Sequence, residues 1–145
     1  MNYKHTQIGY LMIFIFLAVV VLFGIVLKLA GLNPVLVVTS FLILFLLASF
    51  ISLKVTVDKK HLRIKFGYGI FTKRFELEKI VSVKTVKNAW YHGWGIRIWF
   101  WPYMRIYNIS GFDAVEIKIK DGKRYRIGTD EPKKLEVAIT QAIKR

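Results

Sequence analysis

Three histidines and two glutamates are the side chains of this sequence best suited to acid–base or metal chemistry. His5, His61 and His92 lie far apart, without the i,i+4 or His-x-His spacing that brings two imidazoles to one metal ion. Glu76 and Glu78 alternate onto one face of an expected strand end, where a solvated surface is the simpler interpretation. We therefore expect no catalytic residues, no metal site, no cofactor and no small-molecule substrate, and we interpret the protein as a non-enzyme.

The composition excludes further chemistry and suggests two unlike parts. The 145 residues contain no cysteine, which excludes disulfides, thiolate zinc sites and cysteine nucleophiles. Lysine and arginine number 23 against nine acids, for a formal net charge of +14. Because the mean hydropathy is nevertheless +0.41, we expect an apolar segment and a basic segment to be separated along the chain.

A cluster of cations around an expected turn is the first candidate binding site. Its members are Lys59, Lys60, Arg63 and Lys65. They follow an apolar run closely, so we expect several of them to lie within a Debye length of a bilayer, where anionic headgroups attract each cation by about 1 kcal/mol. Three interpretations stay open: charge that serves only orientation and solubility, nonspecific contact with anionic lipid, and a defined headgroup pocket.

The tryptophans form a second cluster, between residues 90 and 101. Trp90 and Trp94 flank a glycine-broken loop and suit either the end of a sheet core or an interface. On the strand that follows, Ile96, Ile98 and Phe100 are expected to fill the inward positions and leave the alternate residues outside. The residues that we expect at a protein interface are Arg97, Trp99, Trp101 and Tyr103.

Two uncharged apolar runs precede these clusters, at about residues 8–28 and 35–53. Each has roughly 20 residues, enough for a helix to cross a hydrocarbon core of about 30 Å. Gly31, Asn33 and Pro34 lie between the runs and interrupt helix. The pattern predicts a transmembrane helical hairpin with a very short turn.

The distribution of cations predicts the orientation of this hairpin. Lys4 precedes the first run, Lys28 alone lies near the turn, and many lysines and arginines follow the second run. Cytoplasmic segments carry the excess of cations. We therefore expect a two-span protein of the cytoplasmic membrane with both termini in the cytoplasm.

Residues 1–53 would thus form the tail and hairpin, and residues 54–145 a cytoplasmic domain with 21 of the lysines and arginines and all nine acids. Apolar and polar residues alternate through most of this domain, as in half-buried antiparallel strands. A helical pattern follows Thr129 or Asp130, either of which is a plausible N-cap. The expected strands are 55–57, 62–66, 71–77, 80–86, 96–101, 103–109, 115–119 and 125–127.

The order of these segments resembles the bacterial pleckstrin-homology-like membrane proteins. The likeness lies in residues 57–67 (VDKKHLRIKFG), residues 80–83 (IVSV) and the closing hairpin and helix of 114–145. It implies an antiparallel bent sheet, or partly open barrel, of about seven strands capped by the C-terminal helix, in a protein of the bacterial inner membrane. It implies no one ligand.

We accordingly expect a membrane-anchored binding module that associates with a protein partner, with its own copies, or with anionic lipid of the inner leaflet. An alternative is an accessory or regulatory subunit of a larger membrane complex. A third interpretation is a membrane-tethered domain that binds nucleic acid, since a pI near 10 with many aromatic residues suits single strands.

Overall fold

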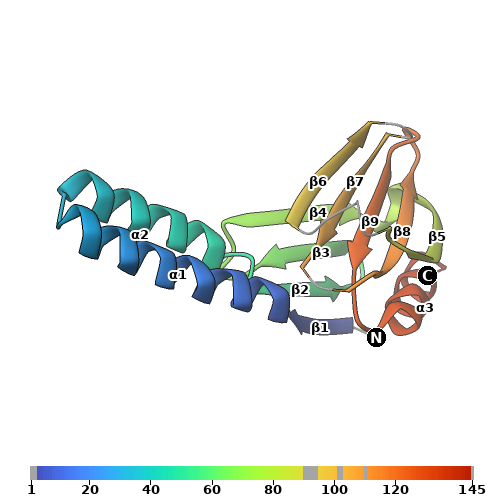
Figure 1. Cartoon of the computed structure of the whole chain (residues 1–145). Coiled ribbons are helices and arrows are strands. Elements are labelled where there is room, and N and C mark those ends of the chain that lie inside the picture. The colour runs from blue at the N-terminus through green and yellow to red at the C-terminus, as the bar shows by residue number, and fades with distance from the viewer. Residues whose placement is uncertain (1–2, 90–94, 101–102, 110, 145) are drawn as a thin grey trace.

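A pair of apolar helices projects from two packed β-sheets in a computed structural model of the chain (Figure 1). The structure describes residues 3–89, 95–100, 103–109 and 111–144, and the side chains of residues 99, 100 and 103 lie outside that description. Within the described residues the fold is α+β, with two sheets and a C-terminal helix that packs against them.

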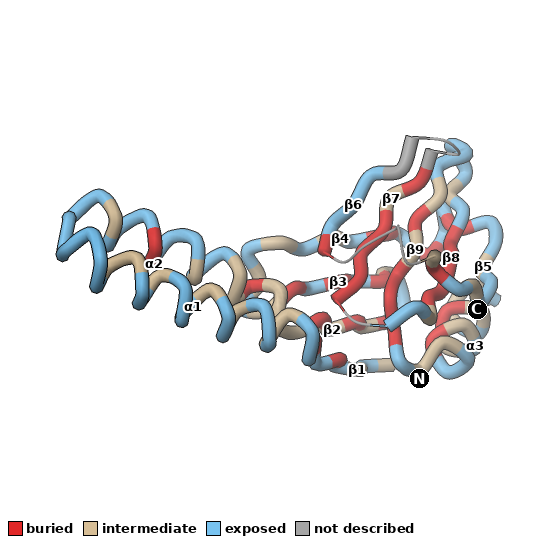
Figure 2. Tube along the Cα trace, in the orientation of Figure 1, coloured by how far each residue is buried: buried red, intermediate tan, exposed pale blue. Residues whose placement is uncertain are grey.

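Helix α1 (Tyr10–Ala30) is the longer of the two projecting helices, with 21 residues and therefore a length of about 31 Å. Its hydropathy and length suffice to cross a membrane, and none of its residues is buried. Figure 2 shows its surface exposed or half-buried along the whole helix. Phe14, for example, is 69% exposed. A soluble domain rarely leaves apolar surface of this extent in water.

Helix α2 (Pro34–Ala48) returns beside α1 but has 15 residues, which gives about 22 Å. The predicted breakers act as expected: Gly31 has φ +82°, and Asn33 caps α2 by accepting a hydrogen bond from Val35 N at 2.8 Å. The predicted span of 35–53 is too long for the observed helix. Leu53, the predicted last residue of the second span, instead belongs to a strand, and its side chain is fully buried in the core between the sheets.

The base of the two helices is closely packed against the sheets. Gly9, between the first strand and α1, donates from its N–H to Ile51 O at 2.7 Å. Gly67 has φ +50°, and a Cβ at this position would lie 2.6 Å from Ser49 O. The Tyr68 hydroxyl donates to Phe45 O in the last turn of α2. The helices therefore continue directly from the sheet domain, without a free linker.

Sheet A has the strand order β1-β2-β3-β4, and all its neighbours are antiparallel. Its strands are β1 (Tyr3–Ile8), β2 (Ser52–Val57), β3 (His61–Phe66) and β4 (Phe71–Glu76). The last three confirm the predicted strands. Strand β1 was expected to be a tail: its polar residues give no strong alternation of their own, and its pairing depends on β2, which lies more than forty residues away in the sequence.

Sheet B has the order β5-β8-β9-β7-β6. Its strands are β5 (Ile80–Lys87), β6 (Gly95–Phe100), β7 (Tyr103–Asn108), β8 (Asp113–Ile119) and β9 (Arg124–Gly128). Strands β7 and β9 pair in parallel, so the prediction of a wholly antiparallel sheet is wrong at this pair. Strand β9 follows β8 through a short turn and forms an antiparallel hairpin with it. The other edge of β9 is then left to pair with β7, which comes earlier in the chain.

The core lies between the two sheets, where alternate apolar residues of β2 and β3 meet those of β8 and β9 (Figure 2). A short 3-10 helix, η1 (Leu77–Lys79), links sheet A to sheet B. Helix α3 (Pro132–Ile143) contacts β5, β8, η1 and β2, and it buries Leu135 and Ile139 completely. The apolar side of this helix therefore packs on the sheets.

The N-cap of α3 lies one residue after Asp130 and two after Thr129, the two predicted N-caps. The N-cap is Glu131, and Pro132 occupies the first turn, where proline is favoured. Thr129, one of the two predicted N-caps, instead accepts a hydrogen bond from Glu131 N at 3.0 Å through its hydroxyl. It therefore orders the turn before the helix.

Candidate functional site

The outward surface of sheet A carries two rows of polar side chains that cross all its strands. Apolar residues of β2, β3 and β4 point into the core, so the alternate residues face outward. The near row, next to the helices, consists of Thr6, Lys54, Lys65 and Thr72. The far row, two residues further along each strand, consists of Lys4, Thr56, Arg63 and Arg74. We call these eight residues the cationic face.

The cationic face holds five positive side chains and no acid in either row. Lys54 lies opposite Lys65, and Arg63 opposite Arg74. Repulsion from Lys4, with a smaller contribution from Lys65, lowers the pKa of Lys54 below its ordinary value. Like charges placed directly opposite each other on neighbouring strands are destabilising. This surface therefore favours binding of an anion.

A shallow hollow of about 530 Å³ lies in this face. It is lined by residues of β2, β3 and β4, among them Thr56 and Thr72. At its far edge, Arg63 Nη2 lies 3.4 Å from Asp58 Oδ2, so one of the cations is partly neutralised. Besides Arg63, the hollow is lined by three cations of the cationic face, Lys54, Lys65 and Arg74, and by two threonines.

The outward surface of sheet B uses the same residue types differently. Glu116 lies in the middle of β8 with its side chain 6% exposed, and Arg126 Nε donates to its Oε2 at 2.9 Å. Lys84 Nζ lies 3.6 Å and Arg124 Nη1 4.0 Å from Glu116 Oε1. Three cations of sheet B therefore share one buried anion, whereas among the eight residues of the cationic face Arg63 alone lies near an acid, Asp58 at the far edge.

The four cations expected to contact lipid occupy different places in sheet A. Lys65 belongs to the near row and Arg63 to the far row, whereas Lys59 and Lys60 are exposed in the turn between β2 and β3. That turn lies at the end of sheet A away from the helices (Figure 1). The six residues of β2 separate it from α2 by about 20 Å, which exceeds a Debye length of about 8 Å. The four residues do not form one cluster beside the helices.

Asp58 organises this distant turn. Its Oδ1 accepts hydrogen bonds from Lys60 N at 2.8 Å and from His61 N at 2.7 Å. These bonds hold the pKa of the Asp58 carboxyl below its ordinary value. The conformation of this turn is therefore explained by hydrogen bonds within the chain.

The residues expected at a protein interface lie on β6 and β7 or between them. Arg97 is exposed on β6, while Trp101 and the side chains of Trp99 and Tyr103 lie outside the described residues, as do Trp90 and Trp94. Ile96 lies opposite the core residue Tyr107, on the inward face as expected, but Ile96 and Ile98 do not fill buried positions, since they are 38% and 48% exposed. The reason is that β6 is the edge of sheet B, next to β7 alone.

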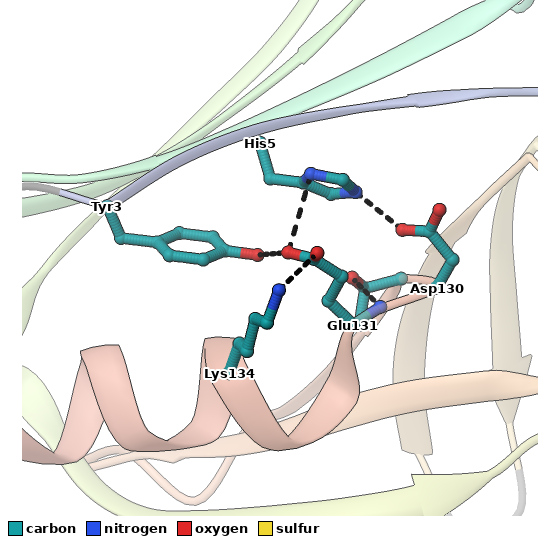
Figure 3. Close-up of polar contacts among 6 residues, drawn as sticks. Tyr3, His5, Asp130, Glu131 and Lys134 are labelled. Carbon is teal, nitrogen blue, oxygen red and sulfur yellow. Dashed lines mark hydrogen bonds and ion pairs between the residues drawn. The ribbon is translucent and has the colours of Figure 1, made fainter.

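A polar cluster that the sequence reasoning missed joins β1 to the start of α3 (Figure 3). His5 Nε2 lies 2.5 Å from Asp130 Oδ1, and the Tyr3 hydroxyl donates to Glu131 Oε2 at 3.3 Å. Burial, followed by the Glu131 charge, raises the pKa of Tyr3 above its ordinary value. A hydrogen bond from Lys134, at 2.8 Å, lowers the pKa of Glu131. The cluster fastens the first strand to the last helix.

The remaining candidates for chemistry lie apart from each other. Glu76 is paired with Lys79 at 3.3 Å, and His61 Nδ1 lies 4.0 Å from Asp58 Oδ1. His92 lies outside the described residues. Within the part of the chain that the structure describes, no group of three His, Cys, Asp or Glu side chains could hold a metal ion.

Comparison of the chain with protein-family models, with curated proteins and with solved structures finds no match. The resemblance to bacterial pleckstrin-homology-like proteins therefore stays a prediction.

Proposed function

We propose that this chain is a membrane-anchored, non-enzymatic binding module whose sheet domain contacts anionic lipid headgroups on the cytoplasmic side. In this proposal α1 and α2 cross the bacterial inner membrane as a hairpin, and both termini lie in the cytoplasm. The bent sheets with their C-terminal helix act as a pleckstrin-homology-like domain. The apolar helices and the cationic face support the two halves of the proposal.

The connections at the base of the hairpin support the anchoring. Strand β1 leads into α1 through Gly9 alone, and α2 leads into β2 after residues 49–51. Because β1 and β2 are paired neighbours, the chain leaves and re-enters sheet A at the same end. A helix as short as α2 is accommodated in a bilayer by local thinning at modest cost.

The single observation that carries the headgroup contact is the position of the near row. Lys54 lies two residues beyond Ser52, the first residue of β2, and Lys65 lies opposite it. Two residues of strand span about 7 Å, which is within a Debye length of about 8 Å. Each of these lysines would gain about 1 kcal/mol beside anionic headgroups.

Photo-cross-linking in vesicles tests this contact. The full chain is reconstituted with phosphatidylserine that carries a photoactivatable headgroup, and the labelled fraction of protein is measured. We expect Lys54→Gln/Lys65→Gln to lower labelling several-fold, because both near-row charges are lost. The matched control Lys59→Gln/Lys60→Gln removes two charges at the distant turn and should label like the unchanged chain. Equal labelling of all three proteins would contradict the proposed contact.

Association with a protein partner or a second copy is the second candidate function, and the edge of sheet B favours it. Ile96 and Ile98 are exposed on β6, on both sides of Arg97 in sequence. An edge strand with exposed apolar residues is a template for pairing with another chain. This surface lies on the opposite sheet from the cationic face, so the two functions are compatible.

A further inference from the structure

We infer that the cationic face is a binding site for a ligand that carries several phosphate groups close together. The inference deepens the proposed function and depends on it only where the phosphates belong to a lipid. The inferred site includes the far row and the hollow in addition to the near row.

The charge balance of the two sheets is the first argument. On sheet B, Lys84 and Arg126 face Glu116 from the two neighbouring strands, so the protein itself supplies the counter-charge. On sheet A, Arg63 lies opposite Arg74 and no acid is present in either row. Among the eight residues of the cationic face, Arg63 alone has an acidic neighbour, Asp58 at 3.4 Å, so the other four cations have room for an external anion.

The chemistry of the side chains is the second argument. Arg63 and Arg74 are adjacent planar donors, which match phosphate oxygens in pairs. Lys54 and Lys65 add point charges in the next row, and the Thr56 hydroxyl lies in the same hollow as a further donor. One phosphate group cannot neutralise this number of cations, so the arrangement suits a cluster of phosphates.

The absence of stacking residues distinguishes this ligand from a nucleic acid. Binding of single strands combines cationic grooves with aromatic side chains on which the bases stack. None of the eight residues of the cationic face is aromatic. The face therefore recognises phosphate rather than base.

Binding measurements on the full chain in phosphatidylcholine discs test the inference. Inorganic tripolyphosphate is the soluble probe, and calorimetry gives its affinity. We expect Arg63→Gln/Arg74→Gln to weaken binding at least about tenfold, which corresponds to the loss of one strong charge-assisted hydrogen bond. The control Lys133→Gln/Lys144→Gln removes two exposed charges from the α3 region and should bind like the unchanged chain.

A second arm identifies a lipid source of the phosphates. The chain is purified from vesicles that contain cardiolipin, whose headgroup carries two phosphate groups, and the cardiolipin retained by the protein is measured. Retention by the unchanged chain and by the control, together with loss in Arg63→Gln/Arg74→Gln, supports a lipid phosphate even if tripolyphosphate does not bind. Lys54→Gln/Lys65→Gln repeats both arms if the arginine variant does not fold.

Three results would overturn the inference. These are the absence of binding in both arms, an equal loss in the control variant, and binding of a single-stranded oligonucleotide that tripolyphosphate does not displace. Tripolyphosphate binding in neutral discs needs no headgroup contact. A failure of the proposed lipid contact in cross-linking is therefore distinguishable from a failure of this site.

Discussion

At the scale of single residues, the same side-chain type has different roles on the two sheets. Arg126 donates a hydrogen bond to the buried carboxylate of Glu116, whereas Arg74 lies opposite another arginine, Arg63, on the neighbouring strand. Both residues follow the alternation that the sequence shows, so alternation alone predicts that they point outward. Which cross-strand neighbour each one meets depends on strand order.

Replacement of Glu116 tests the internal neutralisation of sheet B. We expect Glu116→Gln to lower the free energy of unfolding by about 2–4 kcal/mol, because three cations lose their counter-charge in a largely buried place. Denaturant titration of the detergent-solubilised chain gives the value. Lys118→Gln, at an exposed position of the same strand, should change stability by less than about 0.5 kcal/mol. Equal stability of the two variants would contradict this role of Glu116.

At the scale of elements, β1 has more influence than its length suggests. It completes sheet A, contributes Lys4 and Thr6 to the cationic face, and contacts the start of α3 through His5. A fragment that begins at residue 54 would lack β1 and all but the last four residues of β2. Binding experiments therefore need the full chain.

The junction between the β3–β4 turn and α2 provides a prediction at the same scale. Gly67 and Gly122 both have positive φ, of +50° and +92°, but only Gly67 has backbone within reach of a Cβ. Alanine at either glycine incurs about 1 kcal/mol of backbone strain. We expect Gly67→Ala to lower the thermal midpoint clearly more than Gly122→Ala, because it also displaces Ser49. Equal midpoints would show that the helices are loosely joined to sheet A.

At the scale of the whole molecule, the apolar and cationic parts meet at one place. The helices carry exposed apolar residues along their length (Figure 2). The near-row lysines lie two residues from the end of sheet A at which the helices leave it. A membrane would cover the first surface and could supply anions to the second. The absence of cysteine makes the orientation directly measurable, since an introduced thiol has no background.

Labelling of intact cells with a membrane-impermeant maleimide tests the two-span topology. Leu32→Cys places a thiol in the exposed turn between α1 and α2, and Lys120→Cys places one in the exposed turn after β8. We expect Leu32→Cys to be labelled in intact cells and Lys120→Cys only after the cells are permeabilised. Labelling of both positions, or of Lys120→Cys alone, would exclude the proposed orientation.

The sequence by itself determined the features that depend on local pattern: the apolar runs, the breakers at Gly31 and Asn33, most of the strands, and the amphipathic C-terminal helix, whose start it placed slightly too early. These follow from residue type and from periods of two or 3.6, which act between near neighbours. The sequence also identified Arg63 and Lys65 as binding candidates, but it did not single out Lys54 or Arg74, and it predicted Lys59 and Lys60 near the helices, from which they lie far.

Tertiary structure decided which distant segments became neighbours. It paired β1 with β2, set β7 parallel to β9, made β6 an exposed edge, and brought Lys4 into line with Arg63 and Arg74. None of these pairings has a local signal, because backbone hydrogen bonds between strands are the same for every sequence. Packing of the core side chains selects among them, and that selection depends on the whole chain.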